Sequence, residues 1–413
     1  MDANSRLLRR AFDAAVATAN PKLWLAPHIR SLPRPTGAVR VLSLGKGAIA
    51  MAETFGAEFH GDWSGLAVTP AGTARPVAGF RLLESAHPVP DARSAAAGEA
   101  VLDFAAGATP DDLLLVLMSG GASSLVCAPI AGVSLEQKAE VNRRLLASGA
   151  GIDAINVVRR ALSRTKGGGL LRATHAGMVL TLAASDVPSD RIWDIGSGPA
   201  VPSPSGAAEA MAELNKHAPG LVVGLAKPLE RHARDLQMPD RRWSGEVALG
   251  IEDGAGAAVF RLRAAGIAAE HGGVSDCDVK SAVFTHLSDL EALGSGAIVS
   301  CGELSQAVPE GATGRGGRNE HFLLSLAVEL AGRTDVWALA VDTDGIDGSS
   351  TAAGAWIDPG LLAALDPGEA RAALAAFDAH GFFERHHRLI ETGPTGANLG
   401  DLRILLVDPA PET

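Results

Sequence analysis

The chain has 413 residues, of which 47% are hydrophobic and 20% charged, a composition typical of a globular protein with two or three domains. Its formal net charge of -11 argues against a nucleic-acid-binding surface, because phosphate backbones select basic faces. The three cysteines, Cys127, Cys277 and Cys301, lie far apart without a C-x-x-C pair, so the sequence indicates neither a disulfide framework nor a zinc site.

The first segment, residues 1–21, has the pattern of an amphipathic helix and lacks the apolar core of a signal peptide. No other stretch approaches the roughly 20 apolar residues that a membrane span needs. We therefore expect a cytoplasmic protein without a membrane partner.

Short apolar runs then alternate with longer helical patterns along the chain, and the runs are typical of buried strands. Strand, glycine-rich turn and helix in succession predict an α/β protein with parallel sheets, whose ligands bind beyond the carboxyl ends of the strands. The chemistry is therefore expected in the turns. The predicted strands are residues 39–44, 113–118, 178–184, 297–302, 337–341 and 404–407.

The turn "SLGKGAIAMAE" follows the first predicted strand and opens a helix, which places Lys46 where its ammonium can meet an anion held by main-chain N–H groups. Gly45, Gly47 and Ala50 also match the dinucleotide fingerprint G-x-G-x-x-A. The next strand lacks an acidic residue for a ribose hydroxyl, although Arg75 nearby suits a 2′-phosphate. A lysine that only caps a tight turn is the alternative.

The next turn, "VLMSGGASSL", leaves a strand at Ser119, Gly120 and Gly121 and continues to Ser123. Its N–H and hydroxyl donors predict a cradle for phosphate or carboxylate, although the turn has no Walker sequence. A plain helix cap explains the same residues.

Two turns follow in the middle of the chain. Residues 149–170 carry Asn156, Arg159 and Lys166 on a predicted helix that ends in glycines, and a solvated basic face is the alternative to a binding site. Asp186 comes directly after an apolar run. A carboxylate at that position suits proton abstraction or metal binding, or it caps a turn.

Near residue 315, "GATGRGGRNEH" sets two arginines among glycines just before an amphipathic helix. Glycine lets the backbone approach a ligand closely, a helix N-terminus presents unpaired N–H groups, and guanidinium matches the oxygens of an anion. Gly316, Gly317, Arg318 and Asn319 are therefore candidates for anion binding. A flexible surface turn is the alternative.

The segment "AVDTDGIDGSS" concentrates Asp342, Asp344 and Asp347. Three carboxylates so close repel one another unless a cation bridges them, so they are candidate Mg²⁺ ligands. The later turn "ETGPTGANLGDL" supplies Thr395 and Asn398, which bind a ligand or merely shape the turn.

Together and in this order, the motifs resemble those of the glycerate kinase type-2 family, whose C-terminal part is the MOFRL domain. The resemblance covers the chain from about Leu7 to Val407. It rests on the stretches "LGKGAIAMAE", "HPVPD", "MSGGASSL", "SGAGIDAINVVRRALSRTKGG", "SDVPSDRIWDIGSGP", "GRGGRNE", "TDGIDG" and "TGPTGANLGDL".

The resemblance implies a Rossmann-like α/β domain over residues 1–238, a connecting helical segment over 239–294 and a smaller α/β MOFRL domain over 295–408. It places the active site in the cleft between the domains. The implied reaction is ATP-dependent phosphorylation of the 2-hydroxyl of D-glycerate with Mg²⁺, and it leaves a homodimer open. An NAD(P)H-dependent hydroxypyruvate reductase, a kinase for a related sugar acid and a silent sugar-acid sensor are the alternatives.

Matched position by position, the family's functional lysine, strand-end aspartate and arginine fall on Lys46, Asp186 and Arg318. The sequence departs from the usual family pattern at Ser189, Glu320, His321 and Ala397. The expected substrate- and nucleotide-binding residues are Gly45, Ser119, Gly120, Gly121, Ser123, Asn156, Lys166, Gly316, Gly317, Asn319, Asp344, Thr395 and Asn398.

Overall fold

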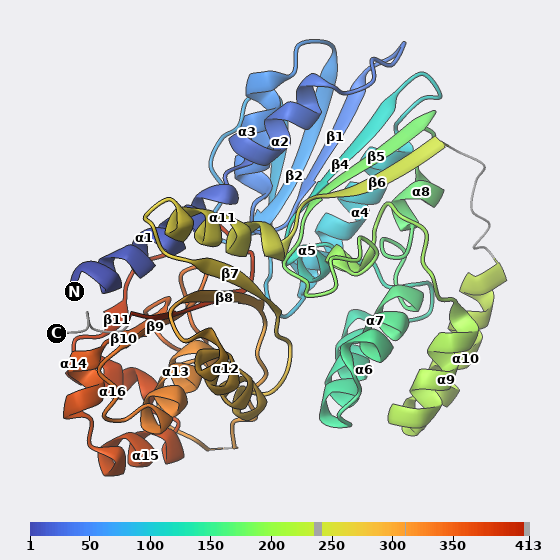
Figure 1. The fold of residues 1–413 in the computed structure, drawn as a ribbon. Coiled ribbons are helices and arrows are strands. Elements are labelled where there is room, and N and C mark those ends of the chain that lie inside the picture. The colour runs from blue at the N-terminus through green and yellow to red at the C-terminus, as the bar shows by residue number, and fades with distance from the viewer. Residues whose placement is uncertain (235–241, 310, 409–413) are drawn as a thin grey trace. The chain divides into compact units, whose positions relative to one another are not determined.

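The computed structural model describes residues 1–234, 242–309 and 311–408 (Figure 1). The chain divides into two compact units. One unit comprises Pro21–Ser185 and Asp190–Leu249, and we call it the parallel-sheet unit. The other comprises Met1–Asn20, Asp186–Ser189 and Gly250–Thr413, and we call it the mixed-sheet unit.

The parallel-sheet unit is built on six strands in the order β3-β2-β1-β4-β5-β6, and every neighbouring pair is parallel. Runs such as "LLLVLM" suit this sheet because helices cover both of its faces and no side of a central strand meets water. The bounds predicted for β1, β4 and β5 are confirmed. The strands are β1 (Val39–Leu44), β2 (Trp63–Pro70), β3 (Phe80–Ser85), β4 (Leu113–Met118), β5 (Met178–Ala184) and β6 (Arg242–Leu249).

Helices flank this sheet, and four of them, α6, α7, α9 and α10, gather into a separate group (Figure 1). This group has its own apolar core, to which Val141, Val158 and Leu214 belong. The helices of the unit are α2 (Pro21–Arg30), α3 (Ala48–Glu58), α4 (Ala92–Ala106), α5 (Ala122–Leu125), α6 (Leu135–Ala147), α7 (Ile152–Ala161), α8 (Gly169–Ala173), α9 (Ala207–His217) and α10 (Val222–Arg234), with short 3₁₀ turns at Ile195–Ser197 and Pro219–Leu221.

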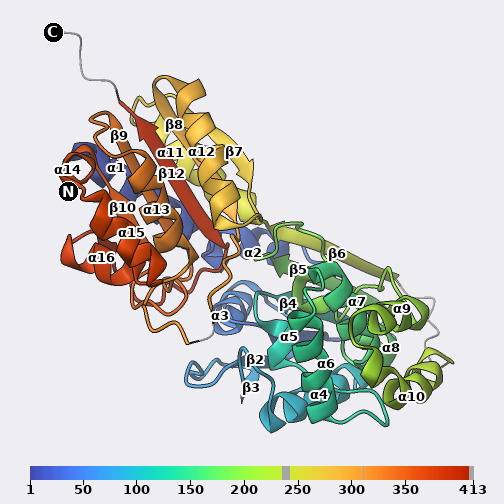
Figure 2. The same ribbon diagram turned by 90° about the horizontal axis from the view of Figure 1, so that it is seen from below.

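The mixed-sheet unit has six strands in the order β11-β10-β9-β12-β8-β7, and β12 lies between β9 and β8 (Figure 2). Only β7 and β8 run parallel, which corrects the expectation of parallel sheets throughout. A loop without a crossover helix joins β9 to β10, and such a connection suits antiparallel neighbours. The strands are β7 (Ala269–Val274), β8 (Gly296–Gly302), β9 (Val336–Asp342), β10 (Gly354–Ile357), β11 (Leu389–Ile390) and β12 (Asp401–Val407).

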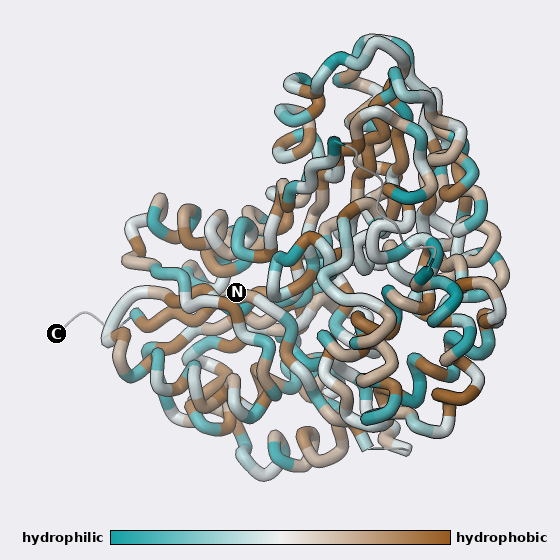
Figure 3. The backbone as a smooth tube through the Cα atoms, turned by 90° about the vertical axis from the view of Figure 1, so that its right-hand side faces the viewer, coloured by the Kyte–Doolittle hydropathy of each residue, from teal (hydrophilic) through white to brown (hydrophobic). Residues whose placement is uncertain are grey.

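Apolar side chains cover both faces of the mixed sheet, and the hydrophobic stretches of chain run along its strands (Figure 3). Leu8 and Phe12 of the first helix pack into the core on one face. None of the described helices is long and apolar enough to cross a membrane. The helices of the unit are α1 (Ala3–Thr18), α11 (Ile251–Arg263), α12 (Val279–Leu293), α13 (Arg318–Glu329), α14 (Pro359–Ala364), α15 (Pro367–Ala375) and α16 (Ala379–Arg385).

These two units differ from the three segments that the family resemblance implied, residues 1–238, 239–294 and 295–408. Helix α1 belongs to the mixed-sheet unit, because its apolar face packs with α11 against that sheet. Residues 239–294, expected as a connecting helical segment, instead contain β6, which completes the parallel sheet, and β7, which forms an edge of the mixed sheet.

Candidate active site

The strand order of the parallel sheet marks one position for a ligand. Strands β1 and β4 are neighbours, and the chain continues from them toward opposite edges of the sheet. Ligands of open α/β sheets bind at such a switch point, beyond the carboxyl ends of the strands. The turn after β1 contains Lys46, and the turn after β4 contains Ser119 to Gly121. The topology therefore brings two of the predicted anion-binding turns together.

The two turns interlock through hydrogen bonds. The N–H of Lys46 donates to the carbonyl of Gly120 (2.8 Å), and the N–H of Gly47 donates to Ser119 Oγ (2.9 Å). Gly45 has a φ of +125°, and a Cβ there would lie 2.3 Å from Ser119 Oγ. Gly45 and Ser119 thus hold the two turns together, and their expected contacts with a ligand stay a prediction.

Lys46 extends beside the second turn. Its side chain is exposed, and a Cβ on Gly121 would lie 3.3 Å from Lys46 Cγ and 3.0 Å from the ring of His87. Within the described part of the chain, the N–H groups of Gly120 and Gly121 donate no hydrogen bond. An ammonium and two available N–H groups make this corner suitable for an anion.

Ser123, four residues beyond Ser119, is held by two cations. Its Oγ accepts hydrogen bonds from Arg159 Nη2 (2.8 Å) and Lys166 Nζ (2.6 Å). Lys166 is only 2% exposed, so the alternative of a solvated basic face is wrong for it. Burial, Lys138 and Arg159 together lower the pKa of Lys166 well below its usual value. Asn156 is buried on the same helix as Arg159.

In the mixed-sheet unit, Arg318 is the first residue of α13 and lies among carboxylates. Its Nε and Nη2 donate to the two oxygens of the fully buried Asp401, at 2.7 and 2.9 Å. Nη2 also donates to Glu303 (3.0 Å) and Asp342 (3.3 Å). Burial opposes the charge of Arg318, but Asp401 outweighs it and raises the pKa of the guanidinium. Arg318 is therefore a fixed, permanently charged fork.

The N-terminus of α13 is already occupied by a carboxylate of the protein. Asp347 accepts hydrogen bonds from the N–H groups of Asn319 (3.2 Å) and Glu320 (2.8 Å), and a Cβ on Gly317 would lie 2.2 Å from its Oδ1. Asn319 is fully buried and donates from its amide to Asp401 (2.8 Å). In the structure these residues bind Asp347 and Asp401, and a contact of theirs with a ligand stays a prediction.

Gly316 has the same kind of structural role. It has a φ of +140°, and a Cβ there would lie 2.9 Å from Glu320 Oε2. Ser349 Oγ donates to the carbonyl of Gly316 (3.0 Å). Packing against the protein itself therefore requires the glycines before Arg318, and the close approach of a ligand to them stays a prediction.

Asp186 meets the last glycine-rich turn. Asn398 donates from its amide to Asp186 Oδ2 (2.8 Å), and Asp186 is half-buried. Thr395 Oγ1 donates to the carbonyl of Thr343 (2.5 Å), and the N–H of Thr395 donates to the carbonyl of Asp344 (3.0 Å). The contacts of Thr395 fix the loop that carries Asn398, so Asn398 is positioned to orient the carboxylate of Asp186.

The three aspartates proposed as Mg²⁺ ligands do not form one site. Among the described residues, no group of three or more His, Cys, Asp or Glu side chains is arranged to hold a metal ion. Asp347 is fully buried against α13, whereas Asp342 accepts from Arg318 and from the N–H of Asp344 (2.9 Å). Burial raises the pKa of Asp347 to about 7, and burial together with Asp401 also raises that of Asp342. The residues therefore do not fit a three-carboxylate magnesium site.

Two families match the chain. Residues 7–224 match a family described as a domain of unknown function, DUF4147, and residues 296–401 match the MOFRL family. A protein of Agrobacterium vitis named "Putative hydroxypyruvate reductase" is 39% identical over 97% of this chain and 94% of its own length. The D-glycerate 2-kinase of Thermotoga maritima is 32% identical over 96% of this chain and 94% of its own.

A solved structure agrees with these relationships. The crystal structure of glycerate kinase from Thermotoga maritima superposes with a TM-score of 0.85 at 29% identity, covering 97% of this chain and 99% of that one. The chain belongs to the glycerate 2-kinase family. In this member of the family, the predicted two-domain α/β fold is confirmed.

The dinucleotide fingerprint has a different explanation in this glycerate 2-kinase relative. Gly45 faces Ser119, so its missing side chain makes room for protein. Arg75, considered for a 2′-phosphate, forms a two-pronged ion pair with Glu53 (2.8 Å for both bonds). The observed contacts give no support to a nicotinamide nucleotide at this turn.

Sequence reasoning missed several polar residues of the two sites. Glu303, which pairs with Arg318, lies beside the end of β8 without a motif of its own. Asp401 belongs to the turn "ETGPTGANLGDL", but its ion pair with Arg318 was not predicted. Lys138 is buried on α6 beside Arg159, although its sequence neighbourhood reads as an ordinary charged helix. The position of Asp401 at the end of a strand could have indicated a site residue, because residues at strand ends lie at the edge of a sheet in parallel and antiparallel sheets alike.

Proposed function

We propose that this protein transfers the γ-phosphoryl group of ATP to the 2-hydroxyl of D-glycerate. The observation that carries the proposal is the anion corner at the switch point, where Lys46 extends beside the N–H groups of Gly120 and Gly121. The similarity to the D-glycerate 2-kinase of Thermotoga maritima over 96% of this chain supports the choice of substrate and position.

Phosphoryl transfer depends mainly on positioning and on cations near the charge of the γ-phosphoryl oxygens. In our proposal Lys46 neutralises that charge, and the N–H groups of Gly120 and Gly121 bind terminal phosphate oxygens. The interlocked turns keep these donors in place, because the bonds from Lys46 and Gly47 prevent the two loops from separating. Such fixed donors favour the transition state without reorganisation during the reaction.

We propose that Arg318 and Asp186 act on glycerate, the acceptor of the phosphoryl group. The carboxylate contacts of Arg318 use Nε and Nη2, and we propose that Nη1 binds the glycerate carboxylate or the migrating phosphoryl group. Asp186, oriented by Asn398, accepts the proton of the 2-hydroxyl as that oxygen bonds to the γ-phosphorus. The bond from the γ-phosphorus to the bridging oxygen breaks, and ADP leaves. That the groups of both units act in one cleft stays a prediction.

We propose that Mg²⁺ enters with ATP, since this ion is commonly bound through substrate phosphates and few carboxylates. The bound ion would supply charge neutralisation for the polyphosphate. Asp342, Asp344 and Asp347 do not form a preassembled site, so no step is assigned to a protein-held metal.

Two assays run side by side test the proposal. ADP formation from ATP should require D-glycerate, while NADH oxidation with hydroxypyruvate should stay at the level of a blank. Reduction of hydroxypyruvate without glycerate-dependent ADP formation would instead support the reductase.

Two broader expectations accompany this function. We propose that the reaction takes place in the cytoplasm, where the free thiols Cys127, Cys277 and Cys301 remain reduced. A homodimer also stays a prediction, which light scattering of the purified protein can test.

A further inference from the structure

A pocket of about 610 Å³ lies within the parallel-sheet unit, between α6, α7 and the segment after β3. Its volume is in the range of sites that hold drug-sized ligands, and a small acid such as glycerate would leave most of it empty. Much of the wall is apolar. The apolar lining includes Val89, Leu135, Val141, Leu146, Val158 and Leu162.

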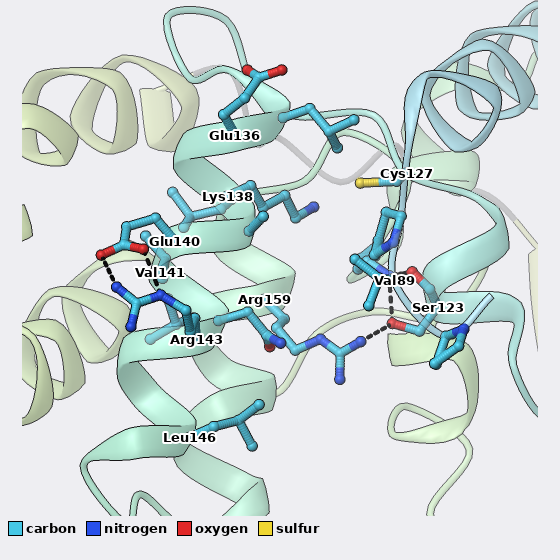
Figure 4. Close-up of a pocket in the computed structure, with 18 residues that line it drawn as sticks. Val89, Ser123, Cys127, Glu136, Lys138, Glu140, Val141, Arg143, Leu146 and Arg159 are labelled. Carbon is cyan, nitrogen blue, oxygen red and sulfur yellow. Dashed lines mark hydrogen bonds and ion pairs between the residues drawn. The ribbon is translucent and has the colours of Figure 1, made fainter. Parts of the chain in front are cut away.

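Three cations define one side of this pocket, and we call Lys138, Arg159 and Lys166 the cationic wall. Figure 4 shows Lys138 and Arg159 extending across the pocket toward Cys127 and Ser123. Arg159 and Lys166 donate to Ser123. Lys138 is 9% exposed, and its Nζ has no hydrogen-bond partner among the described residues.

The carboxylates of the pocket do not neutralise the cationic wall. Glu140 accepts hydrogen bonds from Arg143 (2.6 Å) and Arg144 (2.8 Å), and Glu136 lies in the first turn of α6. None of the three cations forms an ion pair within the described residues. Burial lowers the pKa of Lys138 and of Arg159, and the neighbouring Cys127, which acts in the opposite direction, does not outweigh it.

Unpaired buried cations are costly, and one without a partner destabilises a fold by several kcal/mol. Two buried lysines, Lys138 and Lys166, and the partly buried Arg159 face one pocket without a carboxylate partner, which indicates a site whose anion comes from the ligand. A ligand that fits must combine several negative charges with a flat apolar body. A nucleoside triphosphate has both, because its phosphates suit the cations and its base suits the apolar wall.

The pocket is also continuous in sequence with the anion corner. Ser123 of the pocket is two residues from Gly121, and Pro88 of the pocket follows His87, whose ring lies next to Gly121. We propose that this pocket binds the nucleotide of the kinase reaction, with α- and β-phosphates on the cationic wall and the base against α6 and α7. This inference rests on the proposed function, which supplies ATP as the substrate.

Direct binding tests the pocket without requiring catalysis. The fluorescent nucleotide TNP-ATP is titrated into wild type and into Lys138→Met, which removes the charge at similar volume. We expect at least tenfold weaker binding and an unchanged or higher melting temperature, because an unpaired buried ammonium is lost. Arg144→Met is the control, since Arg144 lies on α6 outside the pocket lining and pairs with Glu140.

A second pair of variants covers the case in which Lys138→Met does not fold. Leu146 lines the pocket and is 61% exposed, so charged substitutions there are tolerated. Leu146→Glu should weaken TNP-ATP binding at least threefold, whereas Leu146→Lys should preserve or tighten it. Competition by unlabelled ATP, tripolyphosphate and adenosine separates binding of phosphates from binding of the base.

The possible outcomes test the nucleotide pocket and the proposed kinase reaction separately. If wild type binds TNP-ATP with the expected variant effects but forms no ADP with glycerate, the pocket stands and the proposed reaction fails. If glycerate is phosphorylated but both Lys138→Met and Leu146→Glu bind TNP-ATP like wild type, the pocket assignment is overturned. The pocket assignment would also be overturned if these variants raised the KM for glycerate and left the KM for ATP unchanged.

Discussion

Replacing Glu320 by Gln should stabilise the protein, and the gain should depend on pH. The carboxyl group of Glu320 is fully buried, where Oε1 accepts from Ser350 Oγ (2.7 Å) and Oε2 has no partner among the described residues. Asp347 lies next to it, because the N–H of Glu320 donates to Asp347. Burial, followed by the charge of Asp347, raises the pKa of Glu320 from 4.5 to about 8.

The sign of the effect follows from proton linkage. Between about pH 4.5 and pH 8 the folded state keeps the proton of Glu320 while the unfolded state loses it, so stability falls as pH rises. At about 1.4 kcal/mol for each pKa unit, the full difference is about 5 kcal/mol above pH 8. Asp347, with a pKa raised to about 7, shares this effect. We therefore expect Glu320→Gln to gain about 1–3 kcal/mol at pH 9 and little at pH 5.

Urea denaturation at pH 5, 7 and 9 measures this gain as the change in unfolding free energy between variant and wild type. Glutamine imitates the protonated acid, so it keeps the shape of the site and the acceptor for Ser350. Glu384→Gln is the matched control, because Glu384 is exposed and pairs with Arg315 at the surface. A gain from Glu320→Gln that is equal at pH 5 and pH 9, or a loss at pH 9, would refute the reasoning.

Four further predictions concern the two sites and the product of the reaction. Lys46→Ala should lower kcat/KM by at least about a hundredfold with unchanged melting, because the exposed Lys46 supports phosphate charge; a steady-state assay with a melting curve checks both. Arg318→Ala should lower activity similarly but also destabilise the protein by about 3 kcal/mol, since the buried Asp401 loses its two-pronged pair and keeps only the longer contact with Arg403 (3.7 Å). Unchanged melting would contradict this. Gly45→Ala should reduce the melting temperature more than Gly72→Ala, because an added Cβ on Gly45 would lie 2.3 Å from Ser119 Oγ. Gly72 is the control, since it also has a positive φ (+80°, against +125° for Gly45) but no atom within 4 Å of an added Cβ. Phosphorus NMR of the product should show 2-phosphoglycerate, and the 3-phosphate would retain the kinase but reject the position.

The sequence alone determined three central strands of the parallel sheet, β1, β4 and β5, and the turns that follow them. The apolar runs of β1, β4 and β5 have few alternatives, because buried parallel strands need continuous hydrophobic side chains and end where glycine and polar residues begin. Lys46 and Asp186 were found for the same reason, since each follows such a run. Their roles in the reaction remain predictions.

Only the tertiary structure decided what the glycines and acids contact. A glycine that avoids a ligand and one that avoids a neighbouring loop look identical in sequence, and Gly45 and Gly317 are of the second kind. Likewise, Asp347 is only three residues from Asp344 but binds the start of α13, which no local pattern reveals. The cationic wall is also a product of the fold. The packing of the helices buries these cations next to one another, and the sequence of each helix does not reveal it.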